Sequence, residues 1–285
     1  MIVYLNGEYM PVEEARISPL DRGFLFGDGI YDVTPSYSGR FIALDRHIDR
    51  LEMCLDNVGM ENPLSREQWR DVAKELCQRN EGESLGIYFH VSRGDEGRRF
   101  HGFPENTPPT VFAMTLETEP HPSVPDRESI QGLRVCSSED LRWRRCNIKS
   151  TALLGNVLHY QQGFGAGMNE TILFNSNDEL TEASSSNVFI VKNGVVATPG
   201  LDHQKLGGIS RHITLSSLRA EGSIPVQERV ILMDEVRIAD EIWITNSNKQ
   251  IAPVIELDGE PVGEGSVGPV WEKAMTIYEA AKYDY

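Results

Sequence analysis

Lys149 and Glu182 offer an amine and a carboxylate that could serve the same cofactor. Lys149 follows Ile148 at the end of a strand-like stretch that also contains Trp143, and desolvation beside these apolar side chains would lower the pKa of the lysine. A neutral amine can form a Schiff base with a carbonyl compound and afterwards carry protons. A carboxylate can tune the electronics of the bound ring. An isolated lysine at a strand end is more often an exposed surface charge, so the assignment depends on the rest of the chain.

Arg50 could bind a phosphate group if Lys149 holds a phosphorylated pyridine aldehyde. It stands between Ile48 and Leu51, which the helical spacing of apolar residues predicts to face the core. An arginine at the edge of such a face can reach inward and bind phosphate through two parallel hydrogen bonds. The alternative is a surface arginine paired with Asp45 or Asp49, and for this residue taken alone that alternative is the commoner outcome.

Backbone N–H groups of residues 207–211 could extend such a phosphate site. This stretch opens a helical pattern, and a helix N-terminus with the Ser210 hydroxyl beside it is suited to bind an anion. Residues 245–248 end a predicted strand and could supply further hydroxyl donors, although an ordinary turn explains them equally well. The glycine-rich residues 163–167 follow a helical pattern rather than a strand, so we expect a helix C-terminus there and not a phosphate loop.

Short strands and helices are expected to position these residues in the first part of the chain. Asn6 and Gly7 between two strand patterns predict a β-hairpin, and the glycines of residues 27–29 predict unusual backbone angles where the next strand starts. Ser65 is a plausible helix N-cap. Strands are expected at residues 2–5, 8–10, 30–33, 86–92 and 110–116, and helices at residues 44–58 and 65–80.

A proline-rich stretch, residues 117–125, is the best candidate for a domain boundary, because it has no periodicity and contains three prolines in its last six residues. We therefore expect an N-terminal domain at 1–118, a linker at 119–126 and a C-terminal domain at 127–285. Beyond the linker, strand patterns cover residues 133–137, 172–174, 187–191 and 242–245, and helices start near Thr151 and Ile209. This order predicts an α+β fold with mixed sheets rather than a doubly wound fold.

Composition limits the class of protein. The chain has 285 residues, 40% of them hydrophobic, which suits two domains with real cores. A formal net charge of −16 argues against nucleic acid or an anionic membrane as partner, but not against a small anion held by local cations. No signal peptide or membrane-spanning run is recognisable, so a cytoplasmic protein is expected. The cysteines have neither metal-ligand spacing nor the density of a disulfide scaffold: Cys54, Cys77, Cys136 and Cys146.

Motifs along nearly the whole chain carry a resemblance to a known family. They are residues 21–23 (Asp-Arg-Gly), 26–29 (Phe-Gly-Asp-Gly), 47–51 (His-Ile-Asp-Arg-Leu), 148–150 (Ile-Lys-Ser), 182–189 and 251–254 (Ile-Ala-Pro-Val). In these motifs the chain resembles the class IV (fold type IV) pyridoxal-phosphate aminotransferases, and within them the bacterial D-amino-acid aminotransferases. The resemblance implies a smaller N-terminal α/β domain, a larger C-terminal mixed-sheet domain with pyridoxal 5′-phosphate between them, and a homodimer with active sites near the subunit interface.

The same resemblance implies roles for the cofactor residues. Lys149 would be the Schiff-base lysine, Glu182 would pair with the pyridinium nitrogen, and Arg50 would bind the phosphate. Ile209, Ser210 and Ser247 would complete the phosphate site.

A loop motif bears on the substrate. In D-amino-acid aminotransferases an arginine and a histidine that match Arg99 and His101 reach in from the neighbouring subunit and bind the substrate α-carboxylate together with a tyrosine that matches Tyr31. A guanidinium, an imidazole and a phenol make a strong oxyanion site. The loop is one residue longer than the pattern, which makes Arg98 a rival of Arg99, and a basic surface loop is the alternative. Asp32 stands where the family usually has glutamate.

The activity that the resemblance implies is a ping-pong transamination. A D-amino acid gives its amino group to the cofactor, and a 2-oxo acid, 2-oxoglutarate or pyruvate, then takes it. Lys149 would move the proton from Cα to the cofactor, while Glu182 keeps the ring nitrogen charged. The alternatives are a branched-chain L-amino-acid aminotransferase, an aminodeoxychorismate lyase, which residues 245–247 resemble as much, and a cofactor-binding protein without turnover.

Overall fold

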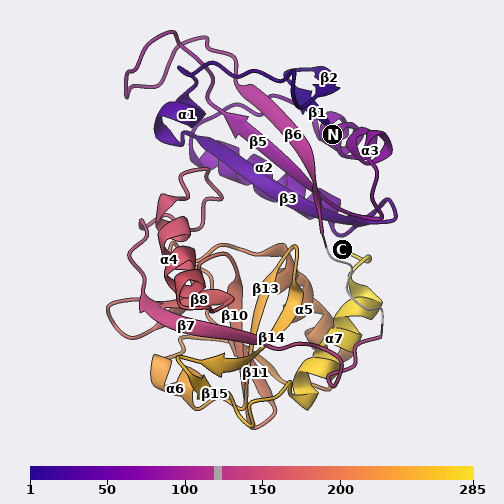
Figure 1. Ribbon diagram of the computed structural model, residues 1–285, viewed down its shortest axis with the longest axis vertical. Coiled ribbons are helices and arrows are strands. Elements are labelled where there is room, and N and C mark those ends of the chain that lie inside the picture. Colours follow the sequence, from indigo (N-terminus) through magenta and orange to yellow (C-terminus); the bar gives the residue numbers. More distant parts are fainter. Residues whose placement is uncertain (119–123) are drawn as a thin grey trace. The chain divides into compact units, whose positions relative to one another are not determined.

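A computed structural model of the chain describes residues 1–118 and 124–285 (Figure 1). The chain forms two compact units, one of Met1–Pro120 with Ile148–Leu153, the other of His121–Asn147 with Leu154–Tyr285. Of the expected linker, residues 119–123 lie outside the described residues. The segment that contains Lys149 belongs to the first unit, whereas a single division at the linker assigned it to the C-terminal domain.

The first unit is built on an antiparallel sheet with strand order β2-β1-β6-β5-β3-β4. Its strands are β1 (Ile2–Leu5), β2 (Glu8–Pro11), β3 (Gly29–Tyr37), β4 (Arg40–Phe41), β5 (Ser84–Ser92) and β6 (Thr110–Glu117). The expected hairpin is confirmed: Asn6 (φ 48°) and Gly7 (φ 102°) take the positive angles that a tight two-residue turn requires.

Three helices complete this unit: α1 (Arg22–Phe26), α2 (Leu44–Asn57) and α3 (Arg66–Arg79). Ser65 caps α3 as expected, since its hydroxyl accepts a hydrogen bond from the backbone of Gln68, whose side chain binds back to Ser65. The apolar faces of α2 and α3 pack on the sheet, where Ile48 and Trp69 join Phe89 in one buried cluster. The helical spacing of apolar residues therefore predicted the core of this unit correctly.

The second unit contains a mixed sheet of order β12-β11-β10-β13-β14-β7-β8-β9, with β15 paired to β14. Its strands are β7 (Leu133–Glu139), β8 (Glu170–Phe174), β9 (Leu180–Ala183), β10 (Asn187–Lys192), β11 (Val195–Thr198), β12 (Val226–Glu228), β13 (Glu241–Asn246), β14 (Gln250–Leu257) and β15 (Glu260–Pro261). Parallel pairing joins β11 to β12, β14 to β7 and β7 to β8, and the other pairs are antiparallel. The predicted α+β architecture with a mixed sheet is confirmed.

The helices of the second unit are α4 (Leu154–Gly165), α5 (Ile209–Glu221), α6 (Met233–Arg237) and α7 (Pro269–Ala281). The glycine-rich stretch ends α4 as expected, and Gly167 follows with a left-handed backbone (φ 76°). Helix α5 begins at Ile209, as predicted, and packs against α7. The strand expected before Lys149 was wrong: residues 142–149 form bends and turns, and only Ser150 pairs, through a single bridge to Ile30 in β3.

Within residues 1–118 and 124–285, none of the helices is both long and apolar enough to cross a bilayer. The same residues contain no group of three or more His, Cys, Asp or Glu side chains placed to hold a metal ion.

Candidate active site

Lys149 is half-buried in the first unit, against Tyr31. Its Nζ lies 4.2 Å from the centroid of the Tyr31 ring, a distance at which the ring face attracts an ammonium group. The backbone of Lys149 is fixed on both sides, because its N–H donates to Cys54 Sγ at 3.3 Å and its carbonyl accepts from the Tyr31 N–H at 3.0 Å. Strand β3 and helix α2 therefore hold the amine in place although the segment itself is not a strand.

Arg50 is buried, not paired at the surface. It is 6% exposed, and its Nε and Nη2 donate to the two oxygens of Asp32, both at 2.8 Å. His47 Nδ1 lies 2.7 Å from the same carboxylate. Burial alone would raise the pKa of Asp32, but the Arg50 and His47 partners outweigh it and hold this pKa well below its usual range. The alternative surface pairing was wrong, since Asp45 and Asp49 bind other arginines of α3.

The loop after β5 carries the expected carboxylate-binding residues. The guanidinium of Arg99 and the ring of His101 each lie 5.1 Å from the Phe26 ring at the end of α1. The rival Arg98 is 68% exposed and pairs with Glu96 at 3.3 Å, and its guanidinium lies over Phe100 instead. The structure thus brings Arg99 and His101 together on one aromatic ring and leaves Arg98 apart from them.

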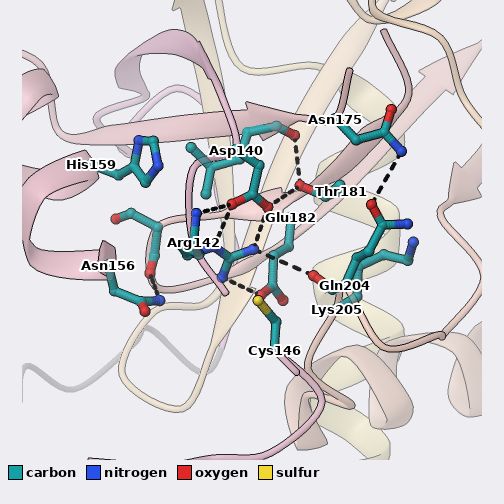
Figure 2. Close-up of polar contacts among 12 residues, drawn as sticks. Asp140, Arg142, Cys146, Asn156, His159, Asn175, Thr181, Glu182, Gln204 and Lys205 are labelled. Carbon is teal, nitrogen blue, oxygen red and sulfur yellow. Dashed lines mark hydrogen bonds and ion pairs between the residues drawn. The ribbon is translucent and has the colours of Figure 1, made fainter. Parts of the chain in front are cut away.

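Glu182 is buried at the end of β9 in the second unit, where Figure 2 shows it beside Arg142. Its Oε1 accepts a 2.6 Å hydrogen bond from Arg142 Nη1. Its Oε2 accepts from the Leu206 N–H at 2.9 Å and from Asn187 Nδ2 at 3.2 Å. Strands β9 and β10 supply Glu182 and Asn187 across the same turn, which explains why the two residues occur five positions apart.

Arg142 is shared between two carboxylates (Figure 2). Besides Glu182, it binds both oxygens of Asp140, through Nε at 2.9 Å and Nη2 at 2.7 Å, and Thr181 donates to Asp140 at 3.0 Å. Burial raises the pKa of Glu182. The positive charge of Arg142 lowers this pKa only in part, because the negative charge of Asp140 nearby acts in the opposite direction. The buried cluster therefore has one cation for two carboxylates, and a further positive group would stabilise ionised Glu182.

The expected phosphate-binding residues of the second unit meet at the N-terminus of α5. Ile209 and Ser210 are its first residues, and no side chain caps this helix end. The Ser210 hydroxyl donates to the carbonyl of Asn246 at 2.9 Å, which joins the start of α5 to the turn that contains Ser247. Gly208, just before the helix, packs closely on Asn187. A Cβ on Gly208 would clash with Asn187 Oδ1. The start of α5 therefore offers backbone N–H groups of the kind that bind an anion.

Sequence reasoning missed Asp140 and Arg142 as site residues. Arg142 stands near two further arginines, and nothing in the residue types distinguishes Arg142, whose side chain is 3% exposed, from the exposed Arg144 and Arg145. The two residues are brought together by a turn after β7, in which the Arg142 N–H donates to Asp140 Oδ1 at 3.1 Å. Arg22, which is 3% exposed, was noted only as part of a motif.

Known proteins resemble the chain over nearly its whole length. The family model "Amino-transferase class IV" matches residues 29–257. A D-alanine aminotransferase of Staphylococcus aureus (strain MW2) is 34% identical over 277 residues, which are 97% of this chain and 96% of that protein. A D-alanine aminotransferase of Listeria monocytogenes serotype 1/2a is 34% identical over 272 residues, 95% of this chain and 92% of that protein.

Solved structures share the fold. The branched-chain aminotransferase from the thermophilic archaeon Thermoproteus uzoniensis with norvaline matches with a TM-score of 0.87 at 24% identity, covering 100% of this chain and 95% of that one. The pyridoxal-phosphate-bound form of a hypothetical aminotransferase from Mycobacterium tuberculosis matches with a TM-score of 0.84 at 19% identity, covering 99% and 98%.

The side chains fit the cofactor that this family uses. An aldehyde needs an amine such as Lys149, and a phosphate needs donors such as those at the uncapped start of α5. A protonated pyridine nitrogen needs a carboxylate, and Glu182 is one that lacks a full counter-charge. The chain belongs to the class IV aminotransferases and is a pyridoxal-phosphate-dependent enzyme.

Proposed function

We propose that the protein transfers the amino group of D-amino acids to a 2-oxo acid such as 2-oxoglutarate, in two half-reactions that use the same site in turn. The D-alanine aminotransferases that share 34% of its residues support this substrate class. The observation that carries the proposal is the placement of Arg99 and His101 together on Phe26, because this pair offers a guanidinium and an imidazole to one carboxylate.

Each residue around the cofactor would have a separate role in the reaction. Pyridoxal phosphate, when bound, supplies a conjugated ring that accepts the electron pair released when the Cα–H bond of the amino acid breaks. Lys149 would hold the cofactor through its Nζ, and the same amine would take up the proton from Cα. Glu182 would keep the ring nitrogen protonated, and Arg142 holds the carboxylate of Glu182 in position.

The phosphate would be bound by Arg50 and by the start of α5. Arg50 is buried and oriented by Asp32, so its guanidinium does not have to be ordered when the anion binds. Ile209 and Ser210 would add backbone N–H donors, and Ser247 a hydroxyl donor.

Stereochoice would follow from where the α-carboxylate is bound. The two enantiomers of an amino acid that present the same Cα–H bond to Lys149 differ in where they place the carboxylate. A carboxylate site made of Arg99, His101 and Tyr31 would select the D-enantiomer. The phenol ring of Tyr31 already lies beside the Lys149 amine, which supports a role for it next to the reacting carbon.

A homodimer would account for the surface of α4. Its apolar side chains Leu154, Val157, Leu158 and Phe164 recur at helical spacing, and each is more than half exposed. Such a stripe is costly to leave in water and is typical of a face covered by a partner. We propose that a second copy covers it and that the loop of Arg99 and His101 serves the active site of the neighbouring subunit.

A donor screen with paired D- and L-enantiomers tests the proposed substrate class. We expect measurable turnover for D-alanine and other D-amino acids and little for their L-counterparts. Turnover of L-leucine or L-valine instead of the D-forms would establish the branched-chain alternative. Release of pyruvate from aminodeoxychorismate without an amino acceptor would establish the lyase, and cofactor binding without any turnover would make the chain a binding protein.

A further inference from the structure

Arg22 is a buried arginine that binds the main chain of the loop with Arg99 and His101. It is 3% exposed, at the first position of α1. Its Nη1 donates to the carbonyls of Phe100 at 2.5 Å and Gly102 at 3.1 Å, and its Nη2 to the carbonyl of His101 at 3.4 Å. One guanidinium thus binds three successive carbonyl groups, and these follow directly on Arg99.

Two carboxylates hold Arg22 in this position. Its Nε donates to Asp28 Oδ2 at 2.8 Å, and its Nη1 also reaches Glu96 Oε1 at 3.1 Å. Asp28 in turn accepts from Arg93 Nε at 2.9 Å, so the carboxylate is fixed from the other side as well. Because long charged side chains are costly to order, a guanidinium held by two buried or partly buried carboxylates has already lost the freedom that binding a loop would otherwise cost.

Phe26 completes the arrangement from the side-chain face. Arg22, Arg99 and His101 all pack on its ring, with the two guanidinium carbons and the imidazole centroid each 5.1 Å from the ring centroid. Gly102 lets the Phe100 ring pack against the loop, since a Cβ there would lie 2.5 Å from an atom of that ring. Main chain and side chains of residues 99–102 are therefore held by two residues of the same short helix, Arg22 and Phe26.

We propose that Arg22 and Phe26 are positioning residues that fix residues 99–102 and thereby aim Arg99 and His101 at the carboxylate of the substrate. The proposal rests on the function proposed for Arg99 and His101 above. Neither positioning residue touches the substrate. Each lowers the entropy that the loop must lose when the carboxylate binds, which is the general advantage of a preorganised site.

The expected signature is a change in KM rather than in kcat. Arg22→Lys keeps one positive charge beside Asp28 but cannot bind three carbonyls at once. We expect it to raise the KM for D-alanine about tenfold and to change kcat little, because ordering of the loop is an entropy cost of binding. Phe26→Leu keeps the main-chain contacts and removes the ring, so a smaller rise in KM is expected. Arg70→Ala is the control, since Arg70 is an exposed arginine of the same unit that pairs with Asp45 and contacts neither Arg22 nor Glu96 among the described hydrogen bonds and ion pairs.

A second measurement, on the holoenzyme without substrate, reports on the loop itself. Trypsin cleaves after arginine, and the bonds after Arg98 and Arg99 lie in this loop, so the rate of nicking there measures how often the loop opens. We expect Arg22→Lys and Phe26→Leu to be nicked at least several-fold faster than the wild type at these bonds. Unchanged nicking in both variants would overturn the proposal. If only Phe26→Leu can be purified, unchanged nicking in that variant alone would overturn it.

The double variant Arg22→Lys/Arg99→Ala separates the inference from the proposed function. If Arg22 acts through Arg99, the double variant has the KM of Arg99→Ala alone, which is the non-additivity of residues in one unit. Equal and independent increases in KM would overturn the inference while leaving the carboxylate role of Arg99 intact. If Arg99→Ala itself leaves KM unchanged, the proposed carboxylate site is wrong. The role of Arg22 in aiming Arg99 is then overturned too, even if the nicking experiment shows that Arg22 holds the loop.

Discussion

Arg142 donates a 2.6 Å hydrogen bond to Glu182 while the same guanidinium binds both oxygens of Asp140. Two buried carboxylates thus compete for one positive charge, and burial raises the pKa of Glu182 despite its partner. A protonated ring nitrogen, as proposed above, would supply the missing positive charge of this cluster. Arg142 and Asp140 then act as a support that holds Glu182 at one place and in one orientation.

Glu182→Gln should still bind the cofactor but slow the reaction. The amide keeps the shape of the side chain and can accept from Arg142, but it cannot stabilise a protonated ring nitrogen. We expect the half-reaction with D-alanine, followed by stopped-flow absorbance, to slow about 10²–10³-fold, the size typical for the loss of one electrostatic contact in an active site. Glu256→Gln, which removes a carboxylate from an ion pair with Arg134 near the surface, is the control and should be unaffected. An unchanged rate in Glu182→Gln would remove Glu182 from the mechanism.

Lys149→Ala should abolish covalent attachment of the cofactor and lower turnover by several orders of magnitude, because one amine has both to hold the cofactor and to move the proton. Borohydride reduction followed by peptide mass spectrometry checks the attachment. The wild type should carry the added mass on the peptide with Lys149, and so should the control Lys192→Ala, whose lysine pairs with Asp240 at the surface. Near-native turnover of Lys149→Ala without added amine would contradict the assignment.

Arg50→Ala should weaken retention of the cofactor, measured as the pyridoxal phosphate needed for half-maximal activity after dialysis. Asp32→Asn should have a smaller effect in the same direction, because Arg50 keeps its charge but loses the carboxylate that orients it at 2.8 Å. The control is Arg70→Ala, which removes an exposed arginine of the same unit. If both Arg50 and Asp32 variants hold the cofactor through dialysis as the wild type does, their pair serves only the stability of the fold.

Local patterns predicted much of what positions the site. The start of α5 at Ile209 follows from the switch to helical spacing after Gly208, and the cap of α3 follows from Ser65. The same periodicity predicted the buried face with Ile48 and Leu51, but it left open whether Arg50, at the edge of that face, is buried or at the surface. These features depend on residues that are neighbours in the sequence or one helical turn apart, so they can be predicted from the sequence alone.

Partners far apart in the sequence were not predictable in this way. Arg50 is held by Asp32 from β3, and Lys149 is held by Cys54 and Tyr31, although its own segment has no strand. The apolar residues near Lys149 resembled a strand by type, but the segment obtains its order from contacts with other elements. Tertiary contacts of this kind override local propensity, and no pattern in one sequence reports them.

The stability of the protein should fall below about pH 6.5, the ordinary pKa of histidine. Burial lowers the pKa of His47, and Asp32 opposes this only in part. A group whose pKa is lowered on folding stabilises the fold above its unfolded pKa, and this contribution is lost as the pH falls through the folded value, because the unfolded chain takes up the proton first. His90 and His159, whose pKa values burial also lowers, act in the same direction.

His47→Gln tests the share of His47, since glutamine can still donate to Asp32 but does not titrate. The midpoint of thermal unfolding should drop less between pH 8 and pH 5.5 in this variant than in the wild type. An equal drop in both proteins would mean that His47 is not the group responsible.

Mixing two impaired variants, assayed at a D-alanine concentration well below the KM of Arg99→Ala, tests whether the loop of Arg99 serves the neighbouring subunit. In a dimer of one Arg99→Ala chain and one Lys149→Ala chain, a crossing loop leaves one site with both an intact lysine and an intact arginine. Random re-association makes half of the dimers mixed, and one of the two sites in each is complete, so about a quarter of the wild-type sites should be active. Differently tagged chains, purified in two steps, show that mixed dimers have formed, and each variant mixed with itself is the control. Mixed dimers without recovered activity would place Arg99 and Lys149 of the same chain in one site, and the carboxylate of the substrate would then be bound within a single subunit.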